Sequence, residues 1–207
     1  MQQNNHSEPI VNSPQSHQRE GWKSIFSTAL IFVLAPITAL LLTFFVFQSY
    51  QVDGPSMEST LQDNDRLIVS KIPRTWASIT GNDFIPARGD IIVFHRKSGG
   101  DFGGDKQLIK RVIALPGERV VVKNGQLTVF NDEFPDGFQP DKTMDYGSVI
   151  TSTQGNVDLR VGEGEVFVSG DNRDNSLDSR SFGPIKASDI AGKLAYRVYP
   201  FDSAQSF

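Results

Sequence analysis

The stretch Gly54-Pro55-Ser56-Met57-Glu58-Ser59-Thr60-Leu61 divides the chain into two parts of different character. A long apolar run comes before it, and a series of short segments rich in β-branched residues follows it. The Gly-Pro pair favours a bend, which presents the hydroxyl of Ser56 on a turn. A serine hydroxyl becomes a nucleophile only when a neighbouring group accepts its proton, so the first question is which side chain accepts the proton of Ser56.

The composition excludes several classes of function. The chain has 207 residues, a formal net charge of −4 and no cysteine. This length suits one membrane anchor and one medium-sized domain with its own core. An acidic balance without a stripe of Lys and Arg argues against nucleic-acid binding, because phosphates require clustered positive charge. A chain without cysteine has no disulfide, no thiolate nucleophile and no cysteine-ligated zinc.

The first part of the chain predicts a tail and a membrane helix. Residues 1–24 begin with a polar stretch rich in Gln, Asn and Ser, which predicts a disordered cytoplasmic tail. Residues 25–47 carry no charge over 23 positions. As a helix they span about 35 Å, against a hydrocarbon core of about 30 Å, and the run is too long for a cleaved signal peptide. Arg19 and Lys23 precede the run and the next positive residue is Arg66, so the positive-inside rule places the N-terminus in the cytoplasm.

The remainder predicts a mainly β domain over residues 48–200, with a smaller inserted lobe over about 119–164 and a C-terminal tail over 201–207. Strands are expected over residues 66–70, 90–95, 108–114, 119–123, 126–130, 165–169 and 192–199. The Asn124-Gly125 pair between two of them is typical of a tight hairpin.

Two loops are expected in this domain. Residues 72–86 are apolar for an exposed segment and contain Trp76, so they either pack on the domain or dip into the membrane interface. Residues 98–105 are rich in glycine and are expected to form a flexible loop.

Histidine and metal chemistry have little support as means of activating Ser56. His95 is the only histidine outside the N-terminal tail, and it continues an apolar strand, where a histidine is more often structural than catalytic. Neither an H-E-x-x-H helix nor a second histidine accompanies it. We therefore expect no metal and no other cofactor, and keep His95 as a weak candidate for the base.

Lys110 is the other candidate for the base. The alternation of a strand puts Lys110 on the same face as Leu108 and Val112, with Arg111 on the opposite face. For a lysine to be half neutral near pH 7, its pKa must fall by about 3 from a value near 10.4, and burial can supply that change. The alternative is an edge-strand lysine without a catalytic role, and the alternation alone leaves both interpretations open.

The segment from Gly170 to Pro184 contains three acidic residues and two arginines in a turn-prone loop. If this loop approaches Lys110, its carboxylates must be paired with Arg173 and Arg180, because an unpaired carboxylate would restore the charge on the lysine. A solvated loop is the alternative. The segment lacks the central glycine and distal glutamate of an EF-hand.

Four segments in this order, following a single apolar run, resemble the type I signal peptidases. These are membrane-anchored serine-lysine proteases that remove signal peptides from exported preproteins. The matching segments are Gly54 to Leu61, Gly89 to Phe94, Lys110 to Glu118, and Gly170 to Pro184. The resemblance runs from the anchor to Tyr199 and implies a largely antiparallel β catalytic domain with a smaller insertion. It also implies a single-pass protein of the cell membrane, with the catalytic domain outside the cytoplasm.

The resemblance implies roles for individual residues. Ser56 matches the nucleophile, Lys110 matches the general base that later protonates the leaving amine, and Ser176 matches a hydroxyl that orients the amine of the lysine. The supporting ion pairs implied by the resemblance involve Asp178 with Arg180, and Asp171 and Arg173 beside them.

The oxyanion hole departs from part of the family. The backbone N–H of Ser56 is expected to form part of it. Some members use a serine hydroxyl two residues before the nucleophile as the second donor, and this chain has Gly54 there. We include Gly54 in the site, with a backbone donor or water in place of the hydroxyl. Ser59 stands where the family usually has proline, a change that removes no catalytic group.

Substrate choice is expected to follow from shallow pockets that admit small residues at the first and third positions before the cut. The residues that the resemblance places near these pockets are Tyr50, Val52, Met57, Leu61 and Ile109, with ordinary core packing as the alternative for each. An extended substrate would add to a sheet edge. The expected partners are preprotein signal peptides, the lipid bilayer and the secretion translocon. Two rival functions are a self-cleaving protein of the repressor-like serine-lysine type and an inactive membrane-anchored scaffold.

Overall fold

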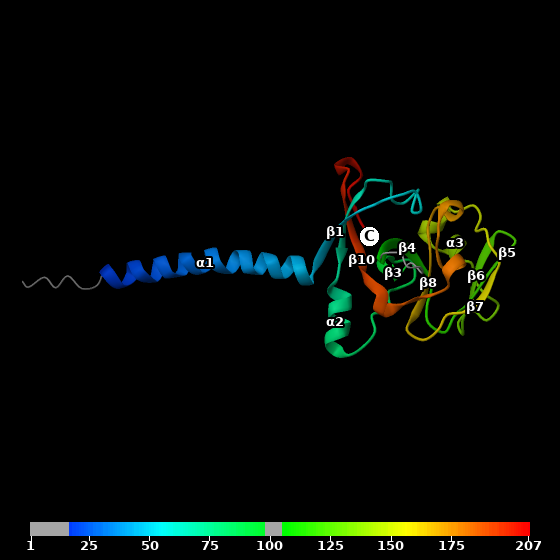
Figure 1. Cartoon of the computed structure of the whole chain (residues 1–207), viewed down its shortest axis with the longest axis horizontal. Coiled ribbons are helices and arrows are strands. Elements are labelled where there is room, and N and C mark those ends of the chain that lie inside the picture. Colours follow the sequence, from blue (N-terminus) through cyan, green and yellow to red (C-terminus); the bar gives the residue numbers. More distant parts are fainter. Residues whose placement is uncertain (1–16, 98–104) are drawn as a thin grey trace, which may run out of the picture. The chain divides into compact units, whose positions relative to one another are not determined.

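The computed structural model describes residues 17–97 and 105–207. The expected disordered tail lies outside the described residues up to residue 16, as does the expected glycine-rich loop from 98 to 104. The chain divides into two compact units, residues 1–42 and 43–207, and each is described by itself (Figure 1).

The first unit is formed by helix α1 (His17–Phe45), which continues through Pro36. The helix begins at His17, so it includes residues that were expected to belong to the tail. Its side chains from Ile25 to Leu41 are all exposed. In the part of the chain that the structure describes, no helix combines the length and the hydropathy needed to cross a bilayer. The membrane span predicted over residues 25–47 therefore stays a prediction.

The second unit is built mainly from short strands. Its strands are β1 (Phe47–Gln51), β2 (Arg66–Ser70), β3 (Ile91–Lys97), β4 (Asp105–Ala114), β5 (Arg119–Lys123), β6 (Gln126–Phe130), β7 (Val157–Arg160), β8 (Glu165–Ser169), β9 (Ile185–Lys186), β10 (Ile190–Tyr199) and β11 (Gln205–Ser206). Its helical elements are α2 (Ile72–Thr80), α3 (Pro140–Thr143), η1 (Asp145–Val149), η2 (Arg173–Asn175), α4 (Ser179–Phe182), η3 (Ala187–Asp189) and η4 (Phe201–Ser203).

The strands form two antiparallel sheets. The larger sheet has the order β1-β2-β10-β3-β4-β8-β9, with β11 paired to β10, and the smaller has the order β6-β5-β7 (Figure 1). The mainly β, antiparallel fold predicted from the sequence is thus confirmed. Because β3 and β4 are central strands, they hold the side chains of the site on a rigid frame.

The hairpin of β5 and β6 follows from two residues that accept positive φ. Asn124 has φ of +53° and Gly125 has φ of +76°, and the register pairs Lys123 with Gln126. A two-residue turn with positive φ at both positions is the type I′ turn, whose twist matches that of the strands. The alternating residues of this hairpin, such as Val120 and Leu127, form a core that continues onto β4 and β8.

A second core lies beneath the Ser56 turn. Met57 and Leu61 are fully buried there, together with Val52, Leu67 and Ile91. Burying large apolar side chains on both sides of a turn fixes its backbone, since each contributes on the order of 2 kcal/mol.

Two segments differ from the expectation. Residues 72–86 were expected to form a loop, but helix α2 begins there with a proline in its first turn and ends at Gly81 with φ of +72°. The helix is short and buries none of its residues, so its apolar pattern did not indicate a packed helix. Residues 201–207 were expected to form a tail, but they fold back through η4, and β11 pairs with β10.

Candidate active site

Ser56 lies on a turn that backbone hydrogen bonds fix at both ends. The N–H of Val52 donates to Asp65 O at 2.9 Å, and the N–H of Leu61 donates to Met57 O at 2.8 Å. Gly54 has φ of +91°, which favours glycine, and its N–H donates to Asp63 Oδ1 at 2.9 Å. The peptide bond before Ser59 is cis. The turn holds the Ser56 hydroxyl at the edge of the buried core.

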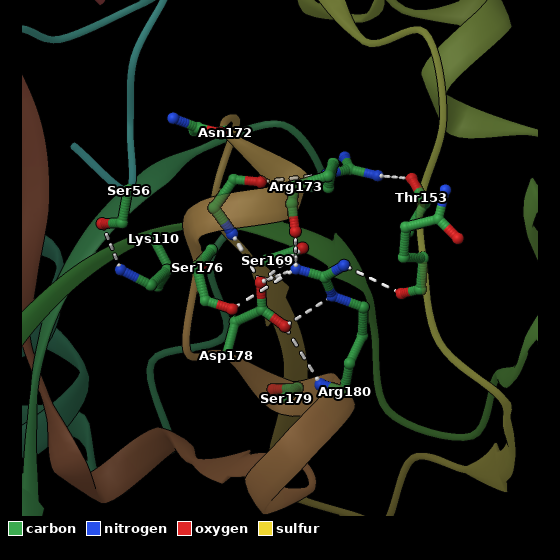
Figure 2. A network of polar contacts seen from close by, with 12 residues as sticks. Ser56, Lys110, Thr153, Ser169, Asn172, Arg173, Ser176, Asp178, Ser179 and Arg180 are labelled. Atoms are coloured by element: carbon green, nitrogen blue, oxygen red, sulfur yellow. Dashed lines mark hydrogen bonds and ion pairs between the residues drawn. The ribbon is translucent and has the colours of Figure 1, made fainter. Parts of the chain in front are cut away.

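Lys110 on β4 meets this hydroxyl directly. Its Nζ lies 2.7 Å from Ser56 Oγ (Figure 2). The same Nζ donates a hydrogen bond to Ile109 O at 2.8 Å. The residue is 3% exposed. The alternation of β4 therefore puts the amine inward, as the sequence pattern indicated, and the two groups lie within the distance of direct proton transfer.

The surroundings of Lys110 favour its neutral form. Burial lowers the pKa of Lys110 from 10.5 to about 8, while the charges of Asp178 and Asp171 act in the opposite direction. Among the described residues, no carboxylate forms an ion pair with the amine. Near neutral pH a fraction of Lys110 is therefore uncharged and able to accept a proton.

The carboxylate of Asp178 is paired with Arg180, as the resemblance implied. Arg180 Nε donates to Asp178 Oδ1 and Nη2 donates to Oδ2, each at 2.8 Å, and Ser169 Oγ and the N–H of Gly170 donate to Oδ2 at 2.8 and 3.0 Å. Burial alone would raise the pKa of Asp178, but these hydrogen bonds and the charge of Arg180 hold it below the ordinary value. Asp178 thus stays ionised, and its ion-pair partner is Arg180 rather than the amine of Lys110.

The carboxylate of Asp171 is paired with Arg111, a partner that the sequence reading missed. Arg111 Nε donates to Asp171 Oδ1 at 2.9 Å and Nη2 donates to Oδ2 at 2.6 Å. Thr60 Oγ1 donates to the same Oδ2 at 2.6 Å, which connects the pair to the Ser56 turn. The alternation of β4 predicted that Arg111 lies on the opposite face from Lys110, but it did not indicate the partner, which is 60 residues away in the sequence.

Arg173, which was expected to pair with an acid of its own loop, binds Asp141 instead. Arg173 Nη2 donates to Asp141 Oδ1 at 2.7 Å, and Nη1 contacts both Asp141 Oδ2 and Thr153 Oγ1. Its Nε donates to Gly170 O at 2.9 Å. Asp141 lies in the short helix α3, in a stretch whose sequence has no repeating pattern, so no sequence signal indicated this contact.

Gly170 is the point at which the two loops touch. A Cβ placed on Gly170 would lie 2.3 Å from both Ser56 O and Ser176 Oγ. The N–H of Asn172 donates to Ser56 O at 3.2 Å. The hydroxyl of Ser176 is buried, lies near the Asp178 carboxylate, and makes no hydrogen bond of good geometry with Lys110 or any other described residue. This close approach requires glycine at position 170. It fixes the Ser56 turn against the loop from Gly170 to Pro184, which contains Asp171 and Asp178.

A cavity of about 490 Å³ opens beside the serine and the lysine. Of the predicted pocket residues, Tyr50, Val52 and Ile109 line it, whereas Met57 and Leu61 lie in the core beneath the turn. The other lining residues are Gln51, Asp53, Ser56, Leu67, Val93, Lys106, Gln107, Leu108 and Lys110. The cavity walls thus come mainly from the end of β1, the Ser56 turn and β4, with one residue each from β2 and β3.

His95 does not reach the site. It pairs across the sheet with Gln107 and lines a separate surface hollow together with Phe182 and Lys186. Within residues 17–97 and 105–207, no group of three or more acidic or histidine side chains has the arrangement of a metal site. The proton acceptor that the described geometry offers to Ser56 is Lys110.

The sequence was compared with known proteins. The model of the family "Signal peptidase, peptidase S26" matches residues 25–199. The probable signal peptidase I-1 of Synechocystis sp. is 36% identical over 185 residues, covering 86% of this chain and 85% of that protein. Signal peptidase I U of Bacillus subtilis is 33% identical over 180 residues, covering 86% and 89%. A crystal structure of a signal peptidase I from Enterococcus faecalis matches 54% of this chain and 97% of that chain, at 31% identity and a TM-score of 0.39.

Proposed function

Because this chain belongs to the signal peptidase family, peptidase S26, we propose that it cleaves signal peptides from preproteins with Ser56 as nucleophile and Lys110 as general base. The family consists of serine endopeptidases that are associated with membranes. The observation that carries the residue assignment is the 2.7 Å contact between Lys110 Nζ and Ser56 Oγ, in a place where burial lowers the pKa of the lysine to about 8.

The proposed reaction has two stages. Neutral Lys110 accepts the proton of Ser56 while Oγ attacks the scissile carbonyl carbon, and the protonated amine then donates that proton to the leaving nitrogen. The C–N bond breaks, the mature protein leaves, and the signal peptide remains as an ester on Ser56. Lys110 then removes a proton from a water molecule, whose oxygen attacks the ester carbon. The bond between this carbon and Ser56 Oγ breaks, Lys110 returns the proton to Oγ, and the signal peptide is released.

The negative oxygen of the tetrahedral intermediate needs hydrogen-bond donors. The N–H of Ser56 has no acceptor among the described residues and is one proposed donor. The N–H of Gly54 is already bonded to Asp63 Oδ1. We therefore assign the second donor to a water molecule or to a backbone group that shifts when substrate binds.

The cavity beside the dyad supports the proposed choice of substrate. Tyr50, Val52 and Ile109 line it, and we propose that they select small residues at the first and third positions before the cut. Met57 and Leu61 contribute from below by fixing the turn. An extended signal peptide between the end of β1 and β4 would gain backbone hydrogen bonds, with the side-chain pockets providing selectivity.

We also propose that residues 25–47 anchor the enzyme in the cell membrane, with the N-terminus in the cytoplasm and the β domain outside. The proposal is supported by the 23 charge-free positions and by the positive residues Arg19 and Lys23 before them. Signal peptides emerge at the bilayer surface, so an anchored enzyme meets both its substrate and the secretion translocon there.

The test is cleavage of a preprotein by the purified full-length enzyme. Ser56→Ala and Lys110→Ala should each lower kcat by roughly 10³-fold or more, because each removes a group that acts in the transition state. Ser206→Ala and Lys186→Ala are matched controls at exposed positions and should keep normal rates. Normal cleavage by both site variants would refute the dyad. Loss of activity through His95→Ala alone would favour a histidine base, and inactivity of the wild type would favour a scaffold.

The pH dependence gives a second test. Lys110 must be neutral to accept a proton, so kcat/KM should rise with pH and level off above a pKa of about 8. A rate that falls as the pH rises from 7 to 9 would contradict a lysine base.

A further inference from the structure

Tyr146, on η1 of the inserted lobe, covers one face of the Arg111 guanidinium. The Cζ atom of Arg111 lies 4.4 Å from the centre of the Tyr146 ring. Along its edge the same guanidinium has other partners, because Nε and Nη2 donate to Asp171 and Nη1 donates to Gly89 O at 2.8 Å. An aromatic ring attracts a cation that lies over its face, most strongly where water is excluded. Arg111 is therefore held both along its edge and on one face.

The position of the Tyr146 ring is fixed by the packing around it. A Cβ placed on Gly147 would overlap the carbonyl oxygen of Asp141, so the backbone of η1 is pressed against α3. The ring itself packs against the core that the hairpin of β5 and β6 shares with β4 and β8. On its other side a Cβ on Gly89 would meet Cε1 of the ring at 3.8 Å. Tyr146 thus connects the inserted lobe with the residue whose carbonyl oxygen binds Arg111.

The hydroxyl of Tyr146 does not account for this placement. It is buried and has no hydrogen-bond partner among the described residues. The charged groups that act on it belong to Asp141, Arg173, Arg111 and Asp171. Burial outweighs them and raises the pKa of the hydroxyl, so it stays neutral in the pH range in which Lys110 titrates. The part of the side chain that has a partner is the aromatic ring.

The ion pair beneath this ring acts on the amine of Lys110. The charges of Asp178 and Asp171 favour the protonated amine, whereas burial opposes it. Asp178 is compensated by Arg180 and Asp171 by Arg111, and the second pair is the one that the ring covers. The other charged side chains that line the cavity with Lys110 are the exposed Asp53 and Lys106. A change in the covered pair therefore changes the charge that the amine experiences.

We propose that Tyr146 is a positioning residue, whose ring holds Arg111 in its ion pair with Asp171 and so keeps this carboxylate compensated beside the catalytic amine. The inference rests on the proposed function, in which Lys110 is the base. The ring keeps water away from one face of the guanidinium, which strengthens the attraction between the two charges. The inserted lobe then acts on the reaction although none of its described residues lines the cavity beside the dyad.

The alternative is that the ring only fills space in the core. A structural role of this kind predicts a lower rate at every pH, whereas a positioning role predicts a loss that depends on pH. If Arg111 moves away from Asp171, the uncompensated carboxylate favours the protonated form of Lys110 and raises its pKa. The fraction of neutral amine then falls near pH 7 and is restored at high pH.

The experiment compares the pH dependence of kcat/KM on a soluble peptide substrate for the full-length enzyme and its variants. Tyr146→Leu removes the ring and keeps an apolar side chain. The midpoint of its profile should rise by about 0.5 to 1 pH unit from a value of about 8. Its kcat/KM at pH 7 should fall by about 3- to 10-fold and should approach the wild-type value above about pH 10. Tyr146→Phe keeps the ring and should keep the wild-type midpoint.

Phe138→Leu is the matched control. Phe138 packs against the same core as Tyr146, and the centre of its ring lies 4.9 Å from Cζ of Arg88. Arg88 pairs with Glu118, which is not among the charges that act on Lys110. Phe138→Leu therefore removes a ring from an arginine without changing the electrostatics of the dyad. It should be destabilised in urea to a similar degree as Tyr146→Leu and should keep the wild-type midpoint.

The outcomes separate this inference from the proposed function. An unchanged midpoint in Tyr146→Leu, with or without a lower plateau, overturns the positioning role and leaves the dyad intact. An equal rise of the midpoint in Tyr146→Phe or in Phe138→Leu overturns it as well, because the effect would not come from the ring over Arg111. A wild-type enzyme that is inactive, or whose kcat/KM does not rise with pH, refutes the proposed function itself. If Tyr146→Leu does not fold, Tyr146→Met has the same expected shift and is measured in its place.

Discussion

The two faces of strand β4 bury two consecutive cations in opposite ways. On one face Lys110 is 3% exposed, lies against Ser56, and has no carboxylate within ion-pair distance among the described residues. On the other face Arg111 is 6% exposed and is held by both carboxylate oxygens of Asp171. Burial therefore lowers the pKa of Lys110, which lacks an acidic partner in the described chain, whereas Arg111 is buried in an ion pair.

This difference teaches how the pKa of a lysine can be lowered beside acidic residues. Asp171 and Asp178 both act on the charge of Lys110, yet each is bonded to an arginine, whose planar group stays protonated and binds both oxygens. The arginines thereby compensate the negative charge of the two carboxylates, which do not need Lys110 as a counter-ion. We expect the proposed base to depend on the two arginines, although neither shares a hydrogen bond or an ion pair with Lys110 in the described part of the chain.

The largest effect on the contrast between the two faces of β4 is expected when Lys110 is replaced. Lys110→Met should lower kcat by roughly 10³-fold or more, since the proton acceptor is gone. The variant should also be more stable at pH 7 by about 3 kcal/mol at most, because burial lowers the pKa of Lys110 from 10.5 to about 8 and so opposes the charged form. The gain is fully present below pH 8 and disappears as the pH rises through 10.5. Urea unfolding at several pH values measures it, and a variant that is less stable at every pH would contradict the unpaired state of the lysine.

Replacement of the arginine should destroy the support. Arg111→Met leaves the Asp171 side chain, which is 0% exposed, without its cationic partner, and should lower the free energy of unfolding by about 3–5 kcal/mol. Arg111→Lys keeps the charge but loses the forked geometry and should give a smaller loss. Chemical denaturation measures both variants. If Arg111→Met left the free energy of unfolding unchanged, the ion pair on the Arg111 face of β4 would not be the stabilising support proposed here.

A methyl group at Gly170, where the Ser56 turn meets the loop that carries Asp171 and Asp178, tests the position of the turn without removing a charge. Gly170→Ala places a Cβ against Ser56 O and Ser176 Oγ, so the turn must move and kcat should fall by roughly 10- to 100-fold. Gly162→Ala is the matched control, because its Cβ meets only the flexible end of Glu165. Steady-state kinetics on a soluble peptide distinguishes them, and equal rates would mean that the turn tolerates displacement.

The smallest effect is expected at an ion pair on the surface. Arg119 and Asp158 form two short hydrogen bonds, but their side chains are 47% and 57% exposed. Asp158→Asn should leave both the activity and the unfolding midpoint unchanged within error, because solvent screens an exposed pair. A loss comparable to that of Arg111→Met would show that burial is not what distinguishes the pairs.

Local patterns were sufficient for most of the strands, whereas the two members of the proposed dyad were assigned through the family resemblance. The alternation around Lys110 and the Asn124-Gly125 turn are encoded within a few residues, and the structure follows both. The partners of the buried charges were harder, since Asp141 and Arg111 meet their partners across 32 and 60 residues of sequence. Spacing alone does not reveal such contacts. Helix α2 was missed because its apolar stripe points away from any core.

The contact at Gly170 has a consequence for when the enzyme becomes active. Thr60, on the turn of the nucleophile, is bonded to Asp171 across 111 residues, so the serine receives its support only after nearly the whole domain has been synthesised. A partly translated chain holds the hydroxyl without the frame that orients it. The contacts that support the Ser56 turn therefore form only once the segment around Asp171 has been synthesised.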